Sequence, residues 1–438
     1  MEENKQEKLL DVEKRIHSFD EVVLGYTQQE AVNEASRCLN CINHPCLNSC
    51  PLHNNIPLFI SQIKNKEFEK ALETLSLTSP FPQVCSRVCA KEKQCESKCT
   101  RGIKQEPIHI NLLERFISDN YSITNKIKQN KNNIKVAIVG AGPSGLACAK
   151  LLATNGFDVT IYEEYKQAGG ILTYGIPEFR LPKQIVNNYI NQIIQLGVKI
   201  NYEKQLGRDV SISSLQKEYK YIYISIGTSK PVYMNIDGED LNGVYVASKF
   251  LKDIYEKKIN NLKNKKVVII GGGNVAMDVA RSVVRLNGEA NILYRRTIEQ
   301  MPACEDELQQ ALQENVHLSQ LVKPLKIKQE KDKLIIECIK TKLGEPDASG
   351  RSRPVDIENS EFEIECDNIV VAVSSQSQSE ILSEIKTEKG LIVVNENQET
   401  SIKNIYAGGD IVHGPYTVVH AIKDGLTAAK SIIQSVML

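Results

Sequence analysis

The chain has 438 residues, which is too long for one ordinary hydrophobic core and predicts two or three domains. Apolar residues make up 41% and charged residues 25%, values that exclude wholesale disorder. Lys plus Arg and Asp plus Glu both number 54, so no excess charge favours a nucleic acid or an anionic membrane as a partner. The charged N-terminal stretch lacks the apolar segment of a secretion signal, and no apolar run is long enough to cross a bilayer. We therefore expect a cytoplasmic protein.

Most of the cysteines are concentrated near the N-terminus. This dense group comprises Cys38, Cys41, Cys46, Cys50, Cys85, Cys89, Cys95 and Cys99. The isolated cysteines are Cys148, Cys304, Cys338 and Cys366, and we expect these to be ordinary buried thiols. A reducing compartment disfavours disulfides, whereas thiolates gathered this densely require a cation to offset their charge. The group therefore predicts bound metal.

The spacing of the dense group favours iron–sulfur clusters over zinc. Its first run is C-x2-C-x4-C-x3-C-P and its second run is C-x3-C-x5-C-x3-C. Structural zinc typically uses two C-x2-C pairs, but only one such pair occurs here. Cys50 directly precedes a proline, and in two-cluster ferredoxins the cysteine of such a Cys-Pro pair binds the other cluster. We expect two [4Fe-4S] clusters, with Cys50 serving the second and one cysteine of the second run completing the first. Zinc remains the alternative.

The rest of the chain repeats one supersecondary pattern. Residues 20–125 are predicted to be mainly helical, and the polar stretch that ends near Asn133 is predicted to be a linker. A strand over 135–139 then leads into a glycine turn and a helix, and about 130 residues later KVVIIGGGNVAMDVAR repeats the design. Two such starts favour two doubly wound nucleotide-binding modules.

The first glycine turn has the spacing of a dinucleotide-binding site. It reads G-x-G-x-x-G, and its candidate cofactor residues are Gly140, Gly142, Ser144 and Gly145. The second strand of this module ends in Glu163, whose carboxylate is placed to accept a hydrogen bond from a ribose hydroxyl. A free 2′-hydroxyl is a feature of FAD and NAD. The alternative is a glycine turn without a ligand.

The second glycine turn is the G-x-G-x-x-A variant. Its candidate cofactor residues are Gly272, Gly273, Asn274 and Val275. Here the second strand ends in Arg295 and Arg296 instead of an acid. Because guanidinium groups suit a 2′-phosphate, this module is predicted to prefer NADPH to NADH. Two solvated surface arginines are the alternative interpretation.

A third glycine-containing segment lies near the C-terminus. Gly409 and Asp410 follow a predicted strand, so Asp410 could bind a ribityl hydroxyl and the helix start near Thr417 could face a flavin. A simple helix cap is the alternative. His413 and His420 are expected to be solvated or packed, because hydride transfer to a flavin needs no base from the protein.

In their order along the chain, these motifs resemble the glutamate synthase small (beta) subunit family. The residues that carry the resemblance are GAGPSG, GGILTYGIPEFRLPK, GGGNVAMDVAR, YRRTIEQMP, LGEPDASGR and AGGD, together with the cysteines. The chain is similar as well to the large subunit of NADH-dependent ferredoxin:NADP oxidoreductase and, more distantly, to the N-terminal part of dihydropyrimidine dehydrogenase. The resemblance implies an α/β fold with an N-terminal helical two-cluster domain and two Rossmann-like domains, the second inserted in the first. The implied boundaries are 1–131, 132–238, 239–366 and 367–438.

The resemblance also implies roles for single residues. FAD would contact the first glycine turn, Glu163, Gly170, Arg180, Asp410 and Thr417, and NADPH would contact the second turn and both arginines. One cluster would bind Cys38, Cys41, Cys46 and Cys99. The other would bind Cys50, Cys89, Cys95 and Glu114, so that Cys85 is not a ligand. Relatives carry an Ala-Ile-Gly-Gln-like turn where this chain has Ala372-Val373-Ser374-Ser375. The glycine of the relatives lets the backbone approach the nicotinamide, so we expect Ser374 to limit how closely NADPH docks here.

The activity that the resemblance implies is electron transfer. Hydride would pass from NADPH to FAD, and single electrons would pass through the clusters to a larger partner subunit, with the glutamate synthase large subunit as the leading candidate. The alternatives are a partner like dihydropyrimidine dehydrogenase and a ferredoxin-linked bifurcating complex.

Overall fold

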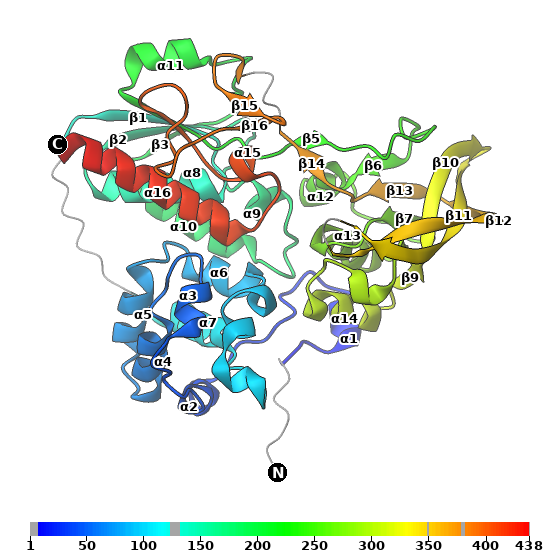
Figure 1. Cartoon of the computed structure of the whole chain (residues 1–438), viewed down its shortest axis with the longest axis horizontal. Coiled ribbons are helices and arrows are strands. Elements are labelled where there is room, and N and C mark those ends of the chain that lie inside the picture. The colour runs from blue at the N-terminus through cyan, green and yellow to red at the C-terminus, as the bar shows by residue number, and fades with distance from the viewer. Residues whose placement is uncertain (1–7, 123–131, 348–349, 378–381, 438) are drawn as a thin grey trace.

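The computed structural model describes residues 8–122, 132–347, 350–377 and 382–437. Helices gather in the N-terminal third of the chain, and two parallel sheets follow (Figure 1). Most of the expected linker falls on residues 123–131 and lies outside the described residues. None of the helices in the described ranges is long and apolar enough to cross a membrane.

The N-terminal region is helical, as its sequence predicted. Its helices are α1 (Val12–Arg15), α2 (Gln28–Ser36), α3 (Pro45–Ser49), α4 (Ile56–Lys64), α5 (Phe68–Ser76), α6 (Pro82–Val88) and α7 (Ile110–Asn120). Three short 3-10 turns follow, η1 (Lys91–Lys93), η2 (Glu96–Lys98) and η3 (Thr100–Ile103), and Cys95 and Cys99 lie between them. Helix α2 begins at a capping box between Thr27 and Glu30.

The first parallel sheet has the strand order β17-β4-β1-β2-β3. Its strands are β1 (Lys135–Val139), β2 (Asp158–Tyr162), β3 (Lys199–Asn201), β4 (Tyr221–Ile224) and β17 (Ile405–Ala407). The helices of this unit are α8 (Pro143–Thr154), α9 (Ile171–Tyr174), α10 (Lys183–Gln195), α11 (Ile212–Glu218), α15 (Asp410–His413) and α16 (Val418–Met437). Because β17 follows the whole second unit in the chain, the second unit is inserted in the first, as expected.

Side chains of β1 alternate between two cores. Val136 and Ile138 pack with α8, α10, α16 and the N-terminal helices, whereas Ala137 and Val139 pack with α11 and α15 on the opposite face. The N-terminal domain therefore shares one apolar core with the first sheet. Lys150 of α8 strengthens this junction by donating a hydrogen bond to the carbonyl oxygen of Pro80 at 2.7 Å.

The second parallel sheet has the order β6-β13-β7-β8-β9. Its strands are β6 (Val244–Val246), β7 (Lys266–Ile270), β8 (Glu289–Tyr294), β9 (His317–Gln320) and β13 (Asn368–Val371), and its helices are α12 (Ala247–Tyr255), α13 (Asn274–Arg285), η4 (Ile298–Gln300) and α14 (Glu305–Gln313). Val267 and Ile269 face these helices. Val268 and Ile270 face an antiparallel sheet of β10 (Val322–Glu330), β11 (Lys333–Pro346) and β12 (Ser352–Cys366).

One expected domain boundary is corrected by the strand pairing. The division at 366/367 would assign β13 to the returning half of the first unit, but β13 pairs with β6 and β7 in the second sheet. Its buried Ile369 and Val371 need neighbours on both edges, which only the second sheet supplies. The chain returns to the first unit after β13. There, β14 (Ser375–Gln376) pairs with β5 (Lys230–Pro231), and β15 (Thr387–Glu388) pairs with β16 (Leu391–Ile392).

Candidate functional site

Both glycine turns open into one large cavity between the two parallel sheets. Its volume is about 1250 Å³, and its lining includes Gly140, Gly142, Gly272 and Gly273. Each turn follows the carboxyl end of a central strand, β1 or β7, which is where open α/β sheets bind ligands. The cavity thus brings the two predicted nucleotide sites together.

The first turn depends on glycines, because side chains at these positions would clash with the backbone or fill the open space of the turn. Gly140 has φ +100°, and a Cβ atom there would lie 2.5 Å from the carbonyl oxygen of Ser225. A Cβ atom at Gly145 would lie 2.0 Å from the carbonyl oxygen of Gly140, so this glycine lets α8 pack closely on β1. No atom lies within 4 Å of a Cβ built at Gly142. This open backbone at the N-terminus of α8 leaves room for a pyrophosphate.

Glu163 lies directly after β2, beside the first turn. Its carboxylate accepts hydrogen bonds from the backbone N–H of Ala141 at 2.7 Å and of Tyr165 at 2.9 Å. Burial raises the pKa of Glu163 to about 7, although these N–H groups act in the opposite direction. The side chain lines the cavity. Ser144 also lines the cavity, but its hydroxyl is hydrogen-bonded to the Tyr223 hydroxyl at 2.6 Å.

The second turn repeats the open geometry. No atom lies within 4 Å of a Cβ built at Gly273, whereas one at Gly272 would lie 2.6 Å from the ring of Tyr294. Asn274 begins α13, and its side chain is fixed by the backbone N–H of Cys304 at 2.7 Å. Val275 is 40% exposed and lines the cavity. The exposed backbone of this turn therefore faces the same space as the first.

The two arginines after β8 have different surroundings. Arg295 is exposed and lines the cavity. Arg296 lines it as well but is buried, and it forms an ion pair with Asp347 at 2.7 Å and donates to the carbonyl oxygen of Ser352 at 2.7 Å. The structure therefore leaves Arg295 as the more available cation for a 2′-phosphate.

Arg180 does not line the cavity, contrary to the expectation that it lies around the flavin. Its guanidinium forms ion pairs with Asp278 of α13 at 2.8 Å and with Glu307 of α14 at 2.8 Å. Two acids from the second unit therefore bind this cation together and hold it at the junction of the units. Asp278 belongs to the second glycine-turn motif, but nothing in that motif predicts an ion pair with Arg180, which lies 98 residues earlier in the chain.

Residues from the C-terminal part complete the wall near the first turn. Asp410 begins α15, and burial raises its pKa to about 6. Gly409, Asp410 and Thr417 line the cavity, although the Thr417 hydroxyl is hydrogen-bonded to His420 Nδ1 at 2.6 Å. Gly170 has φ +55°, and a Cβ there would lie 2.9 Å from the Cα of Gly142, so only glycine fits beside the turn.

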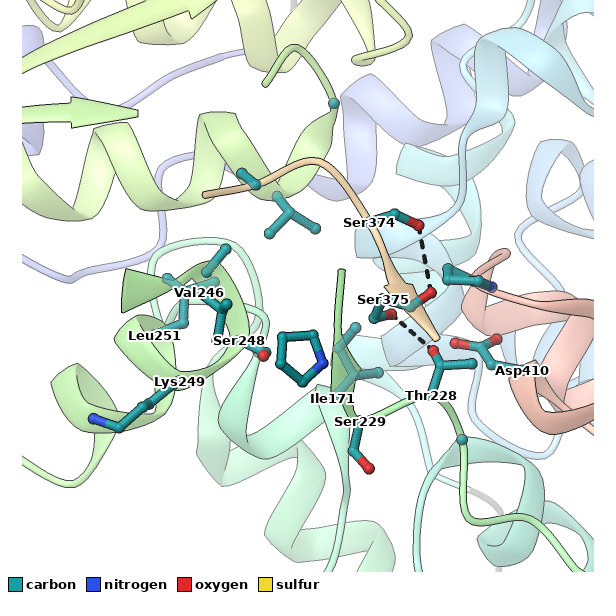
Figure 2. A pocket seen from close by; sticks show the side chains of 18 of the residues that line it. Ile171, Thr228, Ser229, Val246, Ser248, Lys249, Leu251, Ser374, Ser375 and Asp410 are labelled. Atoms are coloured by element: carbon teal, nitrogen blue, oxygen red, sulfur yellow. Dashed lines mark hydrogen bonds between the residues drawn. The ribbon is translucent and has the colours of Figure 1, made fainter. Parts of the chain in front are cut away.

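The two connections between the units meet at the cavity (Figure 2). Ser375 is hydrogen-bonded to Thr228 at 2.9 Å, and the Ser374 hydroxyl donates to the carbonyl oxygen of Ser375 at 3.4 Å. Ser374 is exposed, so its side chain points into open space rather than crowding the fold. Sequence reasoning missed the connection around Thr228 and the start of α12 at Ser248 and Lys249, because neither carries a recognisable motif.

The four cysteines predicted to bind the first cluster line one small cavity in the N-terminal domain. They are Cys38, Cys41, Cys46 and Cys99. Burial raises the pKa of Cys46 to about 11, so this thiol would not ionise near neutral pH without a bound cation. The backbone N–H of Ile108 donates to Cys99 Sγ at 3.5 Å. Arg101 also lines the cavity, and its buried Nε has no hydrogen-bond partner among the described residues.

The second predicted cluster site is a buried group of thiols around Glu114. Burial raises the pKa of Glu114 well above its usual value, and Cys85 adds to this effect. Its Oε1 atom has no hydrogen-bond partner in the described part of the chain. Burial raises the pKa of Cys95, and the charges of Glu96, Cys50 and Glu114 act in the same direction. The thiols of Cys85 and Cys89 are hydrogen-bonded to each other, so Cys85 lies in the same group.

The thiols that line the first cysteine cavity are ligands that suit an iron–sulfur cluster. In a four-iron cluster each ligand binds a different iron, so the ligand atoms stand farther apart than around one zinc ion. The buried Oε1 atom of Glu114, which has no hydrogen-bond partner among the described residues, also fits a role as ligand to a group that is not part of the protein. The isolated Cys148, Cys304, Cys338 and Cys366 are buried, as expected.

Two family models match the chain in the order of its domains. Residues 15–126 match the dihydropyrimidine dehydrogenase domain II, 4Fe-4S cluster, and residues 134–425 match the pyridine nucleotide-disulphide oxidoreductases. The second match covers more than half of the chain. The chain belongs to the pyridine nucleotide-disulphide oxidoreductases. Within this family it carries an additional N-terminal iron–sulfur domain, and it is an oxidoreductase of pyridine nucleotides.

Individual oxidoreductases of this kind match most of the chain. The glutamate synthase [NADPH] small chain of Escherichia coli is 32% identical over 95% of this chain and 93% of its own length, which confirms the resemblance to that family. The NAD-dependent dihydropyrimidine dehydrogenase subunit PreT of Salmonella typhimurium is 33% identical over 94% of this chain and 96% of its own length. The NADP(+)-dependent formate dehydrogenase subunit beta of Moorella thermoacetica is 37% identical over 90%, but the chain spans only 60% of that relative.

Solved oxidoreductases confirm the fold of the two parallel-sheet units. FprA of Mycobacterium tuberculosis in complex with NADPH has a TM-score of 0.59 at 19% identity, covering 70% of this chain and 85% of that one. The thioredoxin reductase of T. acidophilum has a TM-score of 0.54 at 22% identity, covering 70% and 100%. The expected α/β architecture is therefore confirmed.

Proposed function

We propose that this oxidoreductase is an electron-input subunit that takes electrons from NADPH and delivers them singly to a larger acceptor protein. The observation that carries the proposal is the shared cavity, in which the open glycines of both turns, Gly142 and Gly273, face the same 1250 Å³ space. A cavity of this size with two pyrophosphate-binding turns suits FAD and NADPH lying against each other.

Each turn would hold its nucleotide by the same physical means. The backbone N–H groups at the start of α8 and of α13 would bind the pyrophosphates, because both helix N-termini face the cavity. Glu163 would accept a hydrogen bond from a ribose hydroxyl of FAD, and Arg295 would pair with the 2′-phosphate of NADPH. When bound, the flavin supplies the conversion of a two-electron hydride donor into single electrons, and the clusters supply a path for those electrons.

The cysteine sites support delivery to a protein rather than to a small substrate. Seven cysteines and Glu114 form two donor groups, the first of them partly exposed, in a domain whose core is continuous with that of the first sheet. The glutamate synthase large subunit is the leading acceptor, because the glutamate synthase small chain matches over nearly its whole length. An acceptor of the dihydropyrimidine dehydrogenase type is the alternative, because PreT matches to the same extent.

The test is anaerobic purification followed by iron, sulfide and flavin analysis and an assay of NADPH oxidation with ferricyanide. We expect about 8 iron atoms for each FAD, from two four-iron clusters. Purified glutamate synthase large subunit with glutamine and 2-oxoglutarate should then support NADPH oxidation in the absence of ferricyanide. A correctly folded protein without iron or flavin would contradict the proposal. Activity only with a dihydropyrimidine dehydrogenase-type catalytic subunit would select the alternative acceptor.

A further inference from the structure

Exposed apolar side chains flank the first cysteine cavity. In the described ranges, four large apolar side chains are more than three-quarters exposed, namely Ile42, Leu77, Ile103 and Met437. Ile42 is 94% exposed and directly follows Cys41, and Ile103 is 77% exposed at the end of η3, which begins after Cys99. Half of the most exposed apolar side chains therefore border one site.

The two loops that carry Ile42 and Ile103 form a single surface. The Cys41 thiol is hydrogen-bonded to the Thr100 hydroxyl at 3.3 Å, which joins the loops directly. Leu39 of the first loop and Arg101 of the second line the same cavity. Left-handed backbone at Asn40 and His44 turns the first loop tightly around Cys41, so that Ile42 projects outward.

Bound FAD and NADPH would not cover this surface. Other exposed apolar side chains, including Ile171, Val275, Val373 and Tyr416, line the large cavity, where FAD and NADPH would bury them. Ile42 and Ile103 line neither that cavity nor the first cysteine cavity, whereas Leu39 lines the cysteine cavity at its edge with this surface. Their exposure therefore calls for a different occupant.

The same surface is basic. Lys98 and Lys104 border Cys99 and Ile103 on the chain, are exposed, and form no ion pair with any described residue. In contrast, Lys91 of the same domain pairs with Asp306 at 3.0 Å. With Arg101 between them, these cations give the segment 98–106 three positive charges and a single exposed acid, Glu106, whose carboxylate lies 3.5 Å from His109 Nε2. Cations around an apolar centre favour an acidic protein surface.

We propose that this exit surface, formed by Leu39, Ile42, Lys98, Ile103 and Lys104, docks an acidic redox protein beside the first cysteine site. The proposal rests on the proposed function and adds where the acceptor binds and which charge it carries. Electron-transfer complexes typically have small interfaces that are steered by charge, and an exposed apolar pair with a basic rim has this composition. The acceptor's redox centre would then lie next to Cys41 and Cys99 rather than next to the flavin.

The charge of the acceptor is tested with a purified, acidic plant-type [2Fe-2S] ferredoxin as the probe. Its dissociation constant is measured by calorimetry with the loaded protein at low and at high salt. Binding should weaken as salt rises, and Lys98→Glu with Lys104→Glu should weaken it about tenfold or more. The matched control is Lys199→Glu with Lys217→Glu, which reverses two exposed lysines of the first parallel-sheet unit and should leave binding unchanged. Basic cytochrome c should bind more weakly than the ferredoxin.

The apolar centre is tested with Ile42→Ser and Ile103→Ser against Leu77→Ser, which removes an equally exposed apolar side chain of the same domain. Only the first pair should weaken ferredoxin binding, with iron content and NADPH–ferricyanide activity unchanged in all variants. If the isoleucine variants lose iron, their binding no longer tests the surface, and the lysine reversal alone tests the docking proposal. Binding that is insensitive to salt and to the lysine reversal, or equal binding of cytochrome c, would overturn the docking proposal. Loss of iron, flavin and ferricyanide activity from the unmodified protein would instead contradict the proposed function.

Discussion

Arg296 is tied to Asp347 by an ion pair of 2.7 Å, while its neighbour Arg295 is exposed at the cavity. A second hydrogen bond from Arg296 reaches the carbonyl oxygen of Ser352. Asp347 directly follows β11 and Ser352 begins β12, so Arg296 links these two strand ends to the end of β8. Two adjacent arginines that look equivalent in the sequence therefore have different partners.

The first prediction separates these two roles. Arg295→Ala should weaken NADPH binding about tenfold or more and leave NADH binding nearly unchanged, because only NADPH carries the 2′-phosphate. Arg296→Ala should lower the thermal stability instead, since it removes the ion pair with Asp347 and the hydrogen bond to the carbonyl oxygen of Ser352. Titration of both coenzymes and a melting curve for each variant provide the measurements. Equal losses of NADPH and NADH in Arg295→Ala would show that this residue does not recognise the phosphate.

The second prediction concerns the ligands of the second cluster. Cys89→Ser and Glu114→Ala should each lower the iron content, whereas Cys85→Ser should leave it unchanged. Cys85 is buried, with its thiol 3.9 Å from the Ser79 hydroxyl and hydrogen-bonded to Cys89, so a serine there would keep a polar partner for both. Iron and sulfide analysis after anaerobic purification distinguishes the variants. Iron loss in Cys85→Ser with normal iron in Glu114→Ala would assign the fourth ligand to the cysteine.

The third prediction tests the junction between the two parallel-sheet units. Arg180 is held by Asp278 and Glu307, and Phe179 beside it packs under Arg285 with 3.9 Å between the guanidinium carbon and the ring centre. Arg180→Ala should cost about 3–5 kcal/mol of stability because it leaves the buried Asp278 without this cation, whereas Glu307 keeps its ion pair with Arg281. Removing the exposed pair between Lys328 and Glu363 by Lys328→Ala should cost less than about 1 kcal/mol. Denaturant melts of both variants provide the comparison.

The sequence was most informative where function depends on local backbone. The spacing of Gly140, Gly142 and Gly145 predicted a turn, an open approach and a close helix contact, and each glycine has the geometry that its position requires. Such signals are local, because a turn and the helix that follows it are encoded by adjacent residues. Glu114 could be found only through the resemblance, since its burial depends on how α7 packs against other helices.

The sequence was least informative where contacts join distant segments. Arg180 lies in a motif that resemblance assigns to the flavin, but its two acidic partners are 98 and 127 residues away. The boundary at 366/367 failed for a similar reason. A buried strand such as β13 reads the same in either sheet, and only its pairing with β6 and β7 decides where it belongs.

The last prediction uses the pH dependence of Glu163. Burial raises the pKa of this carboxyl to about 7, compared with an unfolded value of 4.5. Between these two values the folded chain binds more protons than the unfolded chain, so stability falls as pH rises through this window and is constant above it. The full loss is about 3 kcal/mol, at about 1.4 kcal/mol for each unit of pKa.

Glu163→Gln should remove this loss in flavin-free protein, because glutamine does not ionise. The melting temperature of the unmodified protein should therefore fall more between pH 5 and pH 8 than that of the variant, and the contributions of Asp278 and Asp410, whose pKa values burial raises to about 6, are common to both. Bound FAD should reduce the difference, since a ribose hydroxyl that donates to the carboxylate stabilises its charged form. A pH dependence that is identical in the two flavin-free proteins would show that folding does not raise the pKa of Glu163.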